Sequence, residues 1–223
     1  SSDEMFIEVN FNTEDLTKNT IALERKLNGY YAMNLHPFMN LIQPNRINEV
    51  IDQYFVQNSD KNAKVLKREF INEDPSLFGV KPFVVKFDIS SEYFVEKKGD
   101  KYLFKLGDLI GPQMEMQQEK KRILPLEAEF NRSYYRTIKI HIPEGYQISN
   151  LEDIIIKNSY TTKDKELFIF DSYYTLEGNV LTVTADEHYR ETFVAPEIFE
   201  AYRTVINSAA DFNKVTLVLE PKK

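Results

Sequence analysis

Residues 137–151 read TIKIHIPEGYQISNL, and this stretch decides the fold class. Its first three isoleucines share one parity, whereas threonine, lysine and histidine occupy the other. Alternation with a period of two is typical of a β-strand that buries one face and turns the other to water. Pro143 and Gly145 then end the strand, because proline lacks the N–H that a sheet needs and glycine permits the positive φ of a tight corner. The stretch therefore predicts a half-buried strand followed by a corner.

The same alternation recurs along the chain, most clearly from Phe83 to Ile89. Two hairpins are predicted, with their turns at residues 97–100 and 177–179, because a glycine in each lies between two alternating segments. Further strands are expected at residues 6–11, 20–26, 63–71, 123–130, 154–156 and 215–220. The chain is therefore predicted to be mainly β.

Two segments change to helical spacing. Residues 47–55 follow Pro44, a favoured residue of a first helical turn, and place their apolar side chains on one stripe. Residues 198–209 follow Pro196 and do the same. We expect a mainly antiparallel, β-sandwich-like fold with two or so packed α-helices, α+β by count. The Gly- and charge-rich segment 107–122 predicts a boundary between residues 1–107 and 108–223, and one continuous domain is the alternative.

Composition excludes several classes of function. The formal net charge of −7 argues against a nucleic-acid partner, which would need a concentrated basic face. No window approaches the roughly 20 apolar residues of a membrane-spanning helix. The chain has no Cys, so disulfides, Cys-ligated metals and thiol nucleophiles are excluded within these 223 residues. Because the first Met is Met5, we expect a trimmed piece or a mature form.

Few residues suggest chemistry. Glu127 and Glu129 share one face of a predicted strand, and paired carboxylates can act in general acid–base catalysis. Alternating Glu residues are, however, also typical of the solvent-exposed face of a sheet. His36, His141 and His188 are scattered, and His141 is expected to face solvent. We therefore predict no catalytic residue, no cofactor and no metal, and we expect this chain not to be an enzyme.

Two surface features leave a binding function open. Residues 186–191 form the densest polar run, which is either a binding rim or a solvated strand end. The adjacent tyrosine pairs would each turn one ring outward from a strand, where tyrosine can stack on a sugar or anchor a protein. These pairs are Tyr30-Tyr31, Tyr134-Tyr135 and Tyr173-Tyr174. A carbohydrate-binding β-sandwich, with a glycan as partner, is therefore an alternative function, weakened by the absence of Trp.

The order RILPLEAEFNRSYYRTIKIHIPEGYQI at residues 122–148 resembles a C-terminal β domain of large envelope proteins from Bacteroidetes-type bacteria. The resembling features are an Arg shortly before a Pro, at Arg122 and Pro125, and the strand end Ile-Pro-Glu-Gly-Tyr at residues 142–146. A final helix at residues 197–210 and a strand at 214–220 also fit, and the stretch RKLNGYYAMNLH at residues 25–36 resembles the segment that leads into this domain.

In that family a domain of unknown function precedes a transglutaminase-like core, and the resembling β domain ends the chain. The resemblance implies a non-catalytic accessory module, which packs beside the upstream transglutaminase-like domain or another envelope protein. It also implies an extracytoplasmic location, in the periplasm or at the cell surface. Because the family's nucleophile is a Cys, and this chain has none, no catalytic residue transfers to it.

Overall fold

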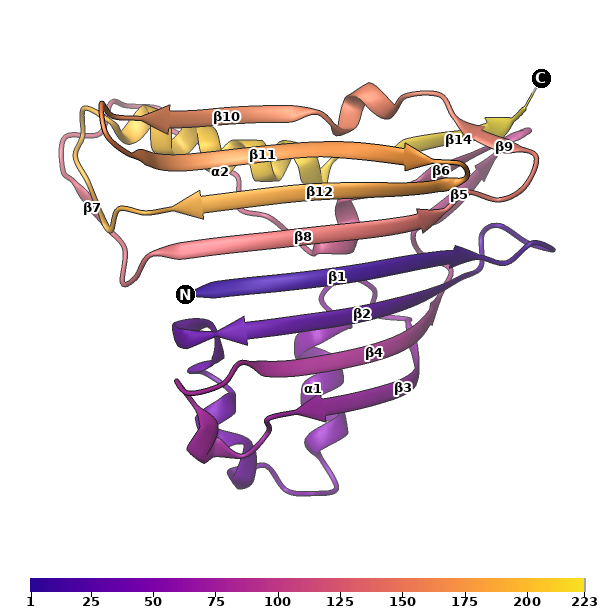
Figure 1. The fold of residues 1–223 in the computed structure, drawn as a ribbon, viewed down its shortest axis with the longest axis horizontal. Coiled ribbons are helices and arrows are strands. Elements are labelled where there is room, and N and C mark those ends of the chain that lie inside the picture. Colours follow the sequence, from indigo (N-terminus) through magenta and orange to yellow (C-terminus); the bar gives the residue numbers. More distant parts are fainter. Residues whose placement is uncertain (223) are drawn as a thin grey trace.

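The strand that carries the alternating isoleucines is β8 (Arg132–His141), and it lies inside an eight-stranded sheet (Figure 1). The computed structural model describes residues 1–222. The order across the sheet is β10-β11-β12-β8-β1-β2-β4-β3. Its other strands are β1 (Ser2–Phe11), β2 (Asn19–Asn28), β3 (Lys64–Ile71), β4 (Phe83–Ser91), β10 (Ile156–Thr161), β11 (Glu166–Glu177) and β12 (Val180–Tyr189).

Two smaller sheets complete the β structure. A four-stranded sheet has the order β5-β6-β14-β9, and a two-stranded one joins β13 to β7. Their strands are β5 (Val95–Lys98), β6 (Lys101–Phe104), β7 (Leu126–Glu127), β9 (Tyr146–Ile148), β13 (Phe193–Val194) and β14 (Leu217–Pro221). Gly145 has a φ of 80° and connects β8 to β9, so the corner predicted after β8 carries the chain from the large sheet into the four-stranded one.

The helices lie behind the large sheet in the view of Figure 1, so they cover one face only. α1 (Ile47–Phe55) contacts β4 through the rings of Phe55 and Phe87, whose centroids lie 6.3 Å apart. α2 (Phe199–Asn213) packs on β10 and β11, where Phe212 contacts Phe170. Short 3₁₀ helices form η1 (Gly29–Ala32), η2 (His36–Leu41), η3 (Pro75–Leu77), η4 (Gly107–Ile110) and η5 (Leu151–Ile154).

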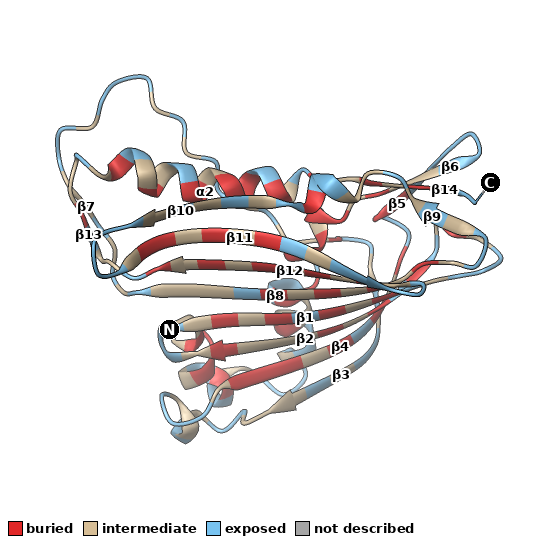
Figure 2. Ribbon diagram, turned by 45° about the horizontal axis from the view of Figure 1, so that its top comes forward, coloured by how far each residue is buried: buried red, intermediate tan, exposed pale blue. Residues whose placement is uncertain are grey.

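The core lies between the sheet and the helices. Figure 2 shows buried residues along the central strands and on α2. Ile138 and Ile140 of β8 are fully buried, as the alternation predicts. The prediction of a mainly β fold with two packed α-helices is confirmed. The neighbouring strands of the large sheet are antiparallel except β1 and β8, which are parallel, with Ile7 opposite Ile138.

Both main sheets combine strands from the two halves of the chain. β1 pairs with β8 in the large sheet, and β6 pairs with β14 in the four-stranded one. The expected boundary between residues 1–107 and 108–223 falls inside η4. The division of the chain at this point stays a prediction.

Three local predictions need correction. Only Leu126–Glu127 of the strand expected at residues 123–130 is extended in a sheet; Ile123 and Leu124 are exposed and lie outside it. The strand expected at 154–156 begins at its last residue and runs to Thr161, after η5. Tyr30 and Tyr31 lie in η1 instead of a strand, because Gly29 with a φ of 60° ends β2.

Candidate functional site

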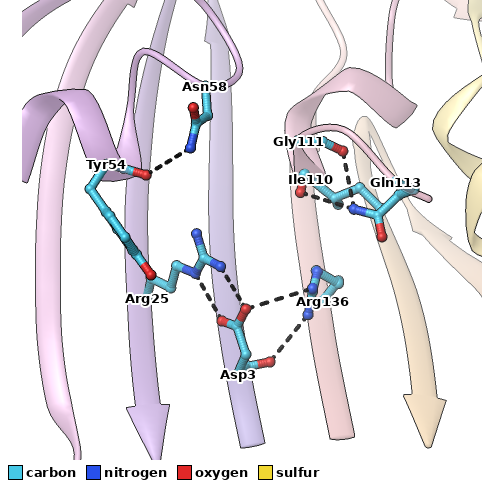
Figure 3. Close-up of polar contacts among 8 residues, drawn as sticks. All are labelled: Asp3, Arg25, Tyr54, Asn58, Ile110, Gly111, Gln113 and Arg136. Carbon is cyan, nitrogen blue, oxygen red and sulfur yellow. Dashed lines mark hydrogen bonds and ion pairs between the residues drawn. The ribbon is translucent and has the colours of Figure 1, made fainter. Parts of the chain in front are cut away.

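A cluster of buried charges lies on the inner face of the sheet, where α1, the segment after η4 and α2 leave a cavity of about 310 Å³ (Figure 3). We call this the arginine pocket. Its charged residues are Asp3 of β1, Arg25 of β2, Arg132 and Arg136 of β8, and Glu187 of β12. Four adjacent strands therefore contribute to it. On each strand the charged residue alternates in phase with the buried residues, so its side chain points toward the helices.

Asp3 and Arg25 form the tightest ion pair of the pocket. Arg25 donates from Nε to Oδ1 at 2.9 Å and from Nη2 to Oδ2 at 2.6 Å, a two-point geometry that suits a guanidinium and a carboxylate. Burial lowers the pKa of Arg25, but the hydrogen bonds and charge of Asp3 outweigh it, so the pKa of Arg25 is raised. Arg25 therefore stays charged inside the protein.

Arg136 lies on the other side of Asp3 and is less well compensated. Its Nη1 donates to the backbone oxygen of Asp3 at 3.1 Å, but its Nη2 is 3.8 Å from Oδ2, beyond hydrogen-bond distance. The guanidinium lies 4.9 Å from the ring centre of Tyr134. The side chain is only 6% exposed, and burial lowers the pKa of Arg136 despite the charge of Asp3.

Arg132 and Glu187 complete the charge distribution. Arg132 donates from Nη2 to the hydroxyl of Tyr202 and stacks 4.9 Å above the ring of Tyr189. Glu187 accepts a hydrogen bond from the Tyr189 hydroxyl at 2.5 Å. Burial raises the pKa of Glu187, against the lowering effects of that hydrogen bond and of Arg136. Three guanidinium groups thus face two carboxyl groups, and the pocket carries an excess of positive charge.

Two buried nitrogens of this cluster lack a partner within residues 1–222. They are Nε of Arg132 and Nε of Arg136. Buried polar atoms are nearly always hydrogen-bonded in native proteins, so such exceptions often mark a functional site. The pocket is therefore the best candidate for a ligand-binding site in this part of the chain.

The residues singled out from sequence do not converge on a common site. Glu127 lies exposed in β7, and Glu129 lines a different, shallow depression beside Asn131. His36 is buried, with Nε2 2.9 Å from the backbone oxygen of Asp74. No group of three or more potential metal ligands occurs among residues 1–222.

The two remaining histidines lie on the outer face of the sheet. Nε2 of His141 is 2.6 Å from Oε1 of Glu8 on the neighbouring strand, so this half-exposed side chain has a partner that sequence did not indicate. His188 contacts the ring of Tyr135 edge to face, with centroids 5.1 Å apart. These contacts are cross-strand packing on a sheet surface.

Sequence reasoning missed the arginine pocket, although one signal for it exists. Arg25 follows Ile21 and Leu23 on the buried parity of β2, and Arg136 precedes Ile138 and Ile140 on the buried parity of β8. A charged residue at an apolar position of an alternating strand indicates a buried ion pair or a binding site. The partners could not be found this way, because they come from other strands.

The outer face of the large sheet is the second notable surface. We call it the open face, because no helix covers it in Figure 1. Phe6 of β1, Tyr135 of β8 and Tyr173 of β11 are exposed there. Around them lie ion pairs such as Glu24 with Lys86, whose atoms Oε2 and Nζ are 3.0 Å apart. The face is thus a mixture of aromatic and charged side chains.

The exposed tyrosines are distributed over different elements. Tyr30 stacks on Phe130, whereas Tyr54 and Tyr93 contact the phenylalanines that follow them in the sequence. Among residues 1–222, no ring contact joins two exposed tyrosines. A sugar-stacking platform is favoured by neighbouring parallel rings, so this geometry does not favour carbohydrate binding, which stays a prediction.

No helix among residues 1–222 is both long and apolar enough to cross a bilayer.

No curated protein matches the chain. Among solved structures, the chain is similar to part of a crystal structure described as "a putative protease" from Parabacteroides distasonis ATCC 8503, with 14% identity and a TM-score of 0.37. This similarity covers 46% of the chain but spans only 19% of the other. The model of a domain of unknown function with a solved structure matches residues 103–219, just over half of the chain. The chain therefore belongs to this family of unknown function, DUF3858.

Proposed function

We propose that the chain is a non-catalytic accessory module of a longer transglutaminase-like protein of the cell envelope. In this proposal the module lies outside the cytoplasm and packs its open face against the transglutaminase-like domain of the same polypeptide. The single observation that carries the proposal is the open face itself, a side of an eight-stranded sheet that no helix covers and that exposes aromatic side chains.

The register places two of these aromatic residues in one row across the sheet. Phe6 lies opposite Thr137, Thr137 opposite Thr184, and Thr184 opposite Tyr173. Three strand spacings separate Phe6 from Tyr173, which amounts to about 14 Å. Tyr135 lies in the adjacent part of β8, so the three rings share one side of the sheet. Aromatic residues in a polar surrounding are typical of protein interfaces.

The resemblance of residues 122–148 supports the choice of partner, because the resembling β domain follows a transglutaminase-like core. The sequence supports a non-catalytic role for this part, since no Cys is present to act as the nucleophile. Any transglutaminase-like chemistry would therefore belong to residues outside this chain. The module would supply a docking surface and fix the orientation of the core.

The test uses the full-length gene product divided into two separately expressed parts, the upstream core and this chain. Wild-type chain should bind the core in isothermal titration calorimetry. Phe6→Asp and Tyr173→Asp should each weaken binding by about tenfold or more, because they place a charge in the centre of the interface. Val80→Asp is the matched control, since Val80 is exposed outside the strands of the open face. Absence of binding, or equal binding by all variants, would contradict the proposal.

A further inference from the structure

We propose that the arginine pocket binds a small organic carboxylate. The proposal is independent of the docking role, because the pocket lies on the inner face of the sheet and the open face is the other side. It rests on three observations: an excess of buried positive charge, unused donors beside Asp3, and an apolar wall opposite them.

The pocket has an excess of positive charge because other groups already engage the carboxylates of Asp3 and Glu187. Both oxygens of Asp3 accept hydrogen bonds from Arg25, and Arg136 on the other side donates no hydrogen bond to this carboxylate. Glu187 is engaged as well, because it accepts a hydrogen bond from the Tyr189 hydroxyl at 2.5 Å. A buried guanidinium without a full counter-ion is unfavourable, and an anion in the pocket would relieve this.

The unused donors flank Asp3 and suit a carboxylate. Arg25 uses Nε and Nη2 for Asp3, so Nη1 takes part in no hydrogen bond among the described residues. Arg136 uses Nη1 for the backbone of Asp3, and its Nη2 likewise makes no hydrogen bond there. Figure 3 shows both guanidinium groups on either side of Asp3. Two N–H donors on neighbouring arginines can hold the two oxygens of one carboxylate.

The size and lining of the pocket favour an organic acid over an inorganic anion. The cavity of about 310 Å³ is at the lower end of the range of small-molecule sites, roughly 300–1,000 Å³. Phe55 of α1, Ile110 of η4 and Ile206 of α2 form apolar walls on the side of the helices. A ligand with a carboxylate and a short apolar body would pair with the arginines and cover these walls at the same time.

The test compares three probes on the 223-residue chain by isothermal titration calorimetry. Benzoate has the charge and the apolar body, benzamide has the same shape without the charge, and inorganic phosphate has charge without the body. Benzoate should bind at least about tenfold more tightly than benzamide and than phosphate. Equal binding of benzoate and benzamide, no benzoate binding at millimolar concentration, or tighter binding of phosphate would overturn the proposal.

Variants locate the binding. Arg136→Met should weaken benzoate binding by about tenfold or more, whereas Arg190→Met, at an exposed arginine outside the pocket, should leave it unchanged. Because Arg136 is buried and its loss could unfold the chain, a second pair of variants changes the exposed rim residue Asn58. Asn58→Lys should tighten and Asn58→Glu should weaken benzoate binding. Equal affinity of these two variants, or wild-type affinity of Arg136→Met, would contradict the assignment.

Discussion

Replacing Asp3 by Asn tests how strongly the buried charges depend on one another. Asp3 is the only acid that contacts both Arg25 and Arg136 within residues 1–222, and its side chain is 2% exposed, against 24% for Arg25 and 6% for Arg136. The substitution keeps the shape and removes the charge, so two buried guanidiniums lose their counter-ion. Breaking a buried ion pair in this way costs about 3–5 kcal/mol of unfolding free energy.

The half-buried pair of Asp52 and Arg68 provides a matched control. It has the same two-point geometry, with distances of 3.1 and 2.6 Å, but its side chains are 17% and 29% exposed. Asp52→Asn should cost only about 0–1 kcal/mol, because it leaves behind only Arg68, which is 29% exposed, whereas Asp3→Asn also leaves behind Arg136, which is 6% exposed. The two substitutions should therefore differ by at least about 2 kcal/mol.

The assay is urea unfolding followed by far-ultraviolet circular dichroism, since the chain has no Trp to report by fluorescence. A double-mutant cycle with Arg25→Met should give a coupling of about 0.5–3 kcal/mol between Asp3 and Arg25. If Asp3→Asn costs no more than Asp52→Asn, the charges of the pocket are solvated or compensated in another way, and the reasoning about the pocket fails.

Three further predictions concern stability. Burial and the charge of Arg190 lower the pKa of His188, so the unfolded chain binds more protons than the folded chain below pH 6.5. Wild type should therefore lose stability relative to His188→Gln as the pH falls below 6.5. Equal urea midpoints of the two proteins across that range would refute this. A Cβ at residue 107 would meet backbone oxygens at the end of α2 at 2.3 Å, so Gly107→Ala should cost about 1–3 kcal/mol in urea unfolding. A cost near zero would mean that η4 and α2 do not pack as described. Phe212→Ala should cost about 3–5 kcal/mol in thermal or urea unfolding, because the ring is fully buried against Phe170; a cost below 1 kcal/mol would show that α2 is not anchored there.

Short-range sequence signals predicted the strands and hairpins well. Gly99 and Gly178 both take positive φ in the expected turns. The turns are shorter than the expected residues 97–100 and 177–179, since Lys98 pairs with Lys101 and Glu177 with Val180 and only two residues remain in each. The strand expected at residues 123–130 failed because alternation alone does not supply a neighbour. Residues without a packing partner do not form a sheet however regular their pattern is.

Long-range pairing could not be predicted. β1 lies parallel to β8, with Ser2 opposite Ser133, and no local pattern indicates a partner about 130 residues away. The arginine pocket depends on this pairing, because it brings Asp3 beside Arg136. Sequence could mark Arg25 and Arg136 as charged residues at buried positions, but not that both would share one carboxylate.

Hydroxyl-radical footprinting with mass spectrometry tests the central claim, that the open face packs against the rest of a longer protein. The oxidation rates of Phe6, Tyr135 and Tyr173 would be compared between the isolated chain and the full-length gene product, with the exposed Tyr93 as an internal reference. We predict that these three residues become protected in the full-length protein while Tyr93 reacts equally in both. Equal reactivity of all four residues in the two proteins would contradict the docking role of the open face.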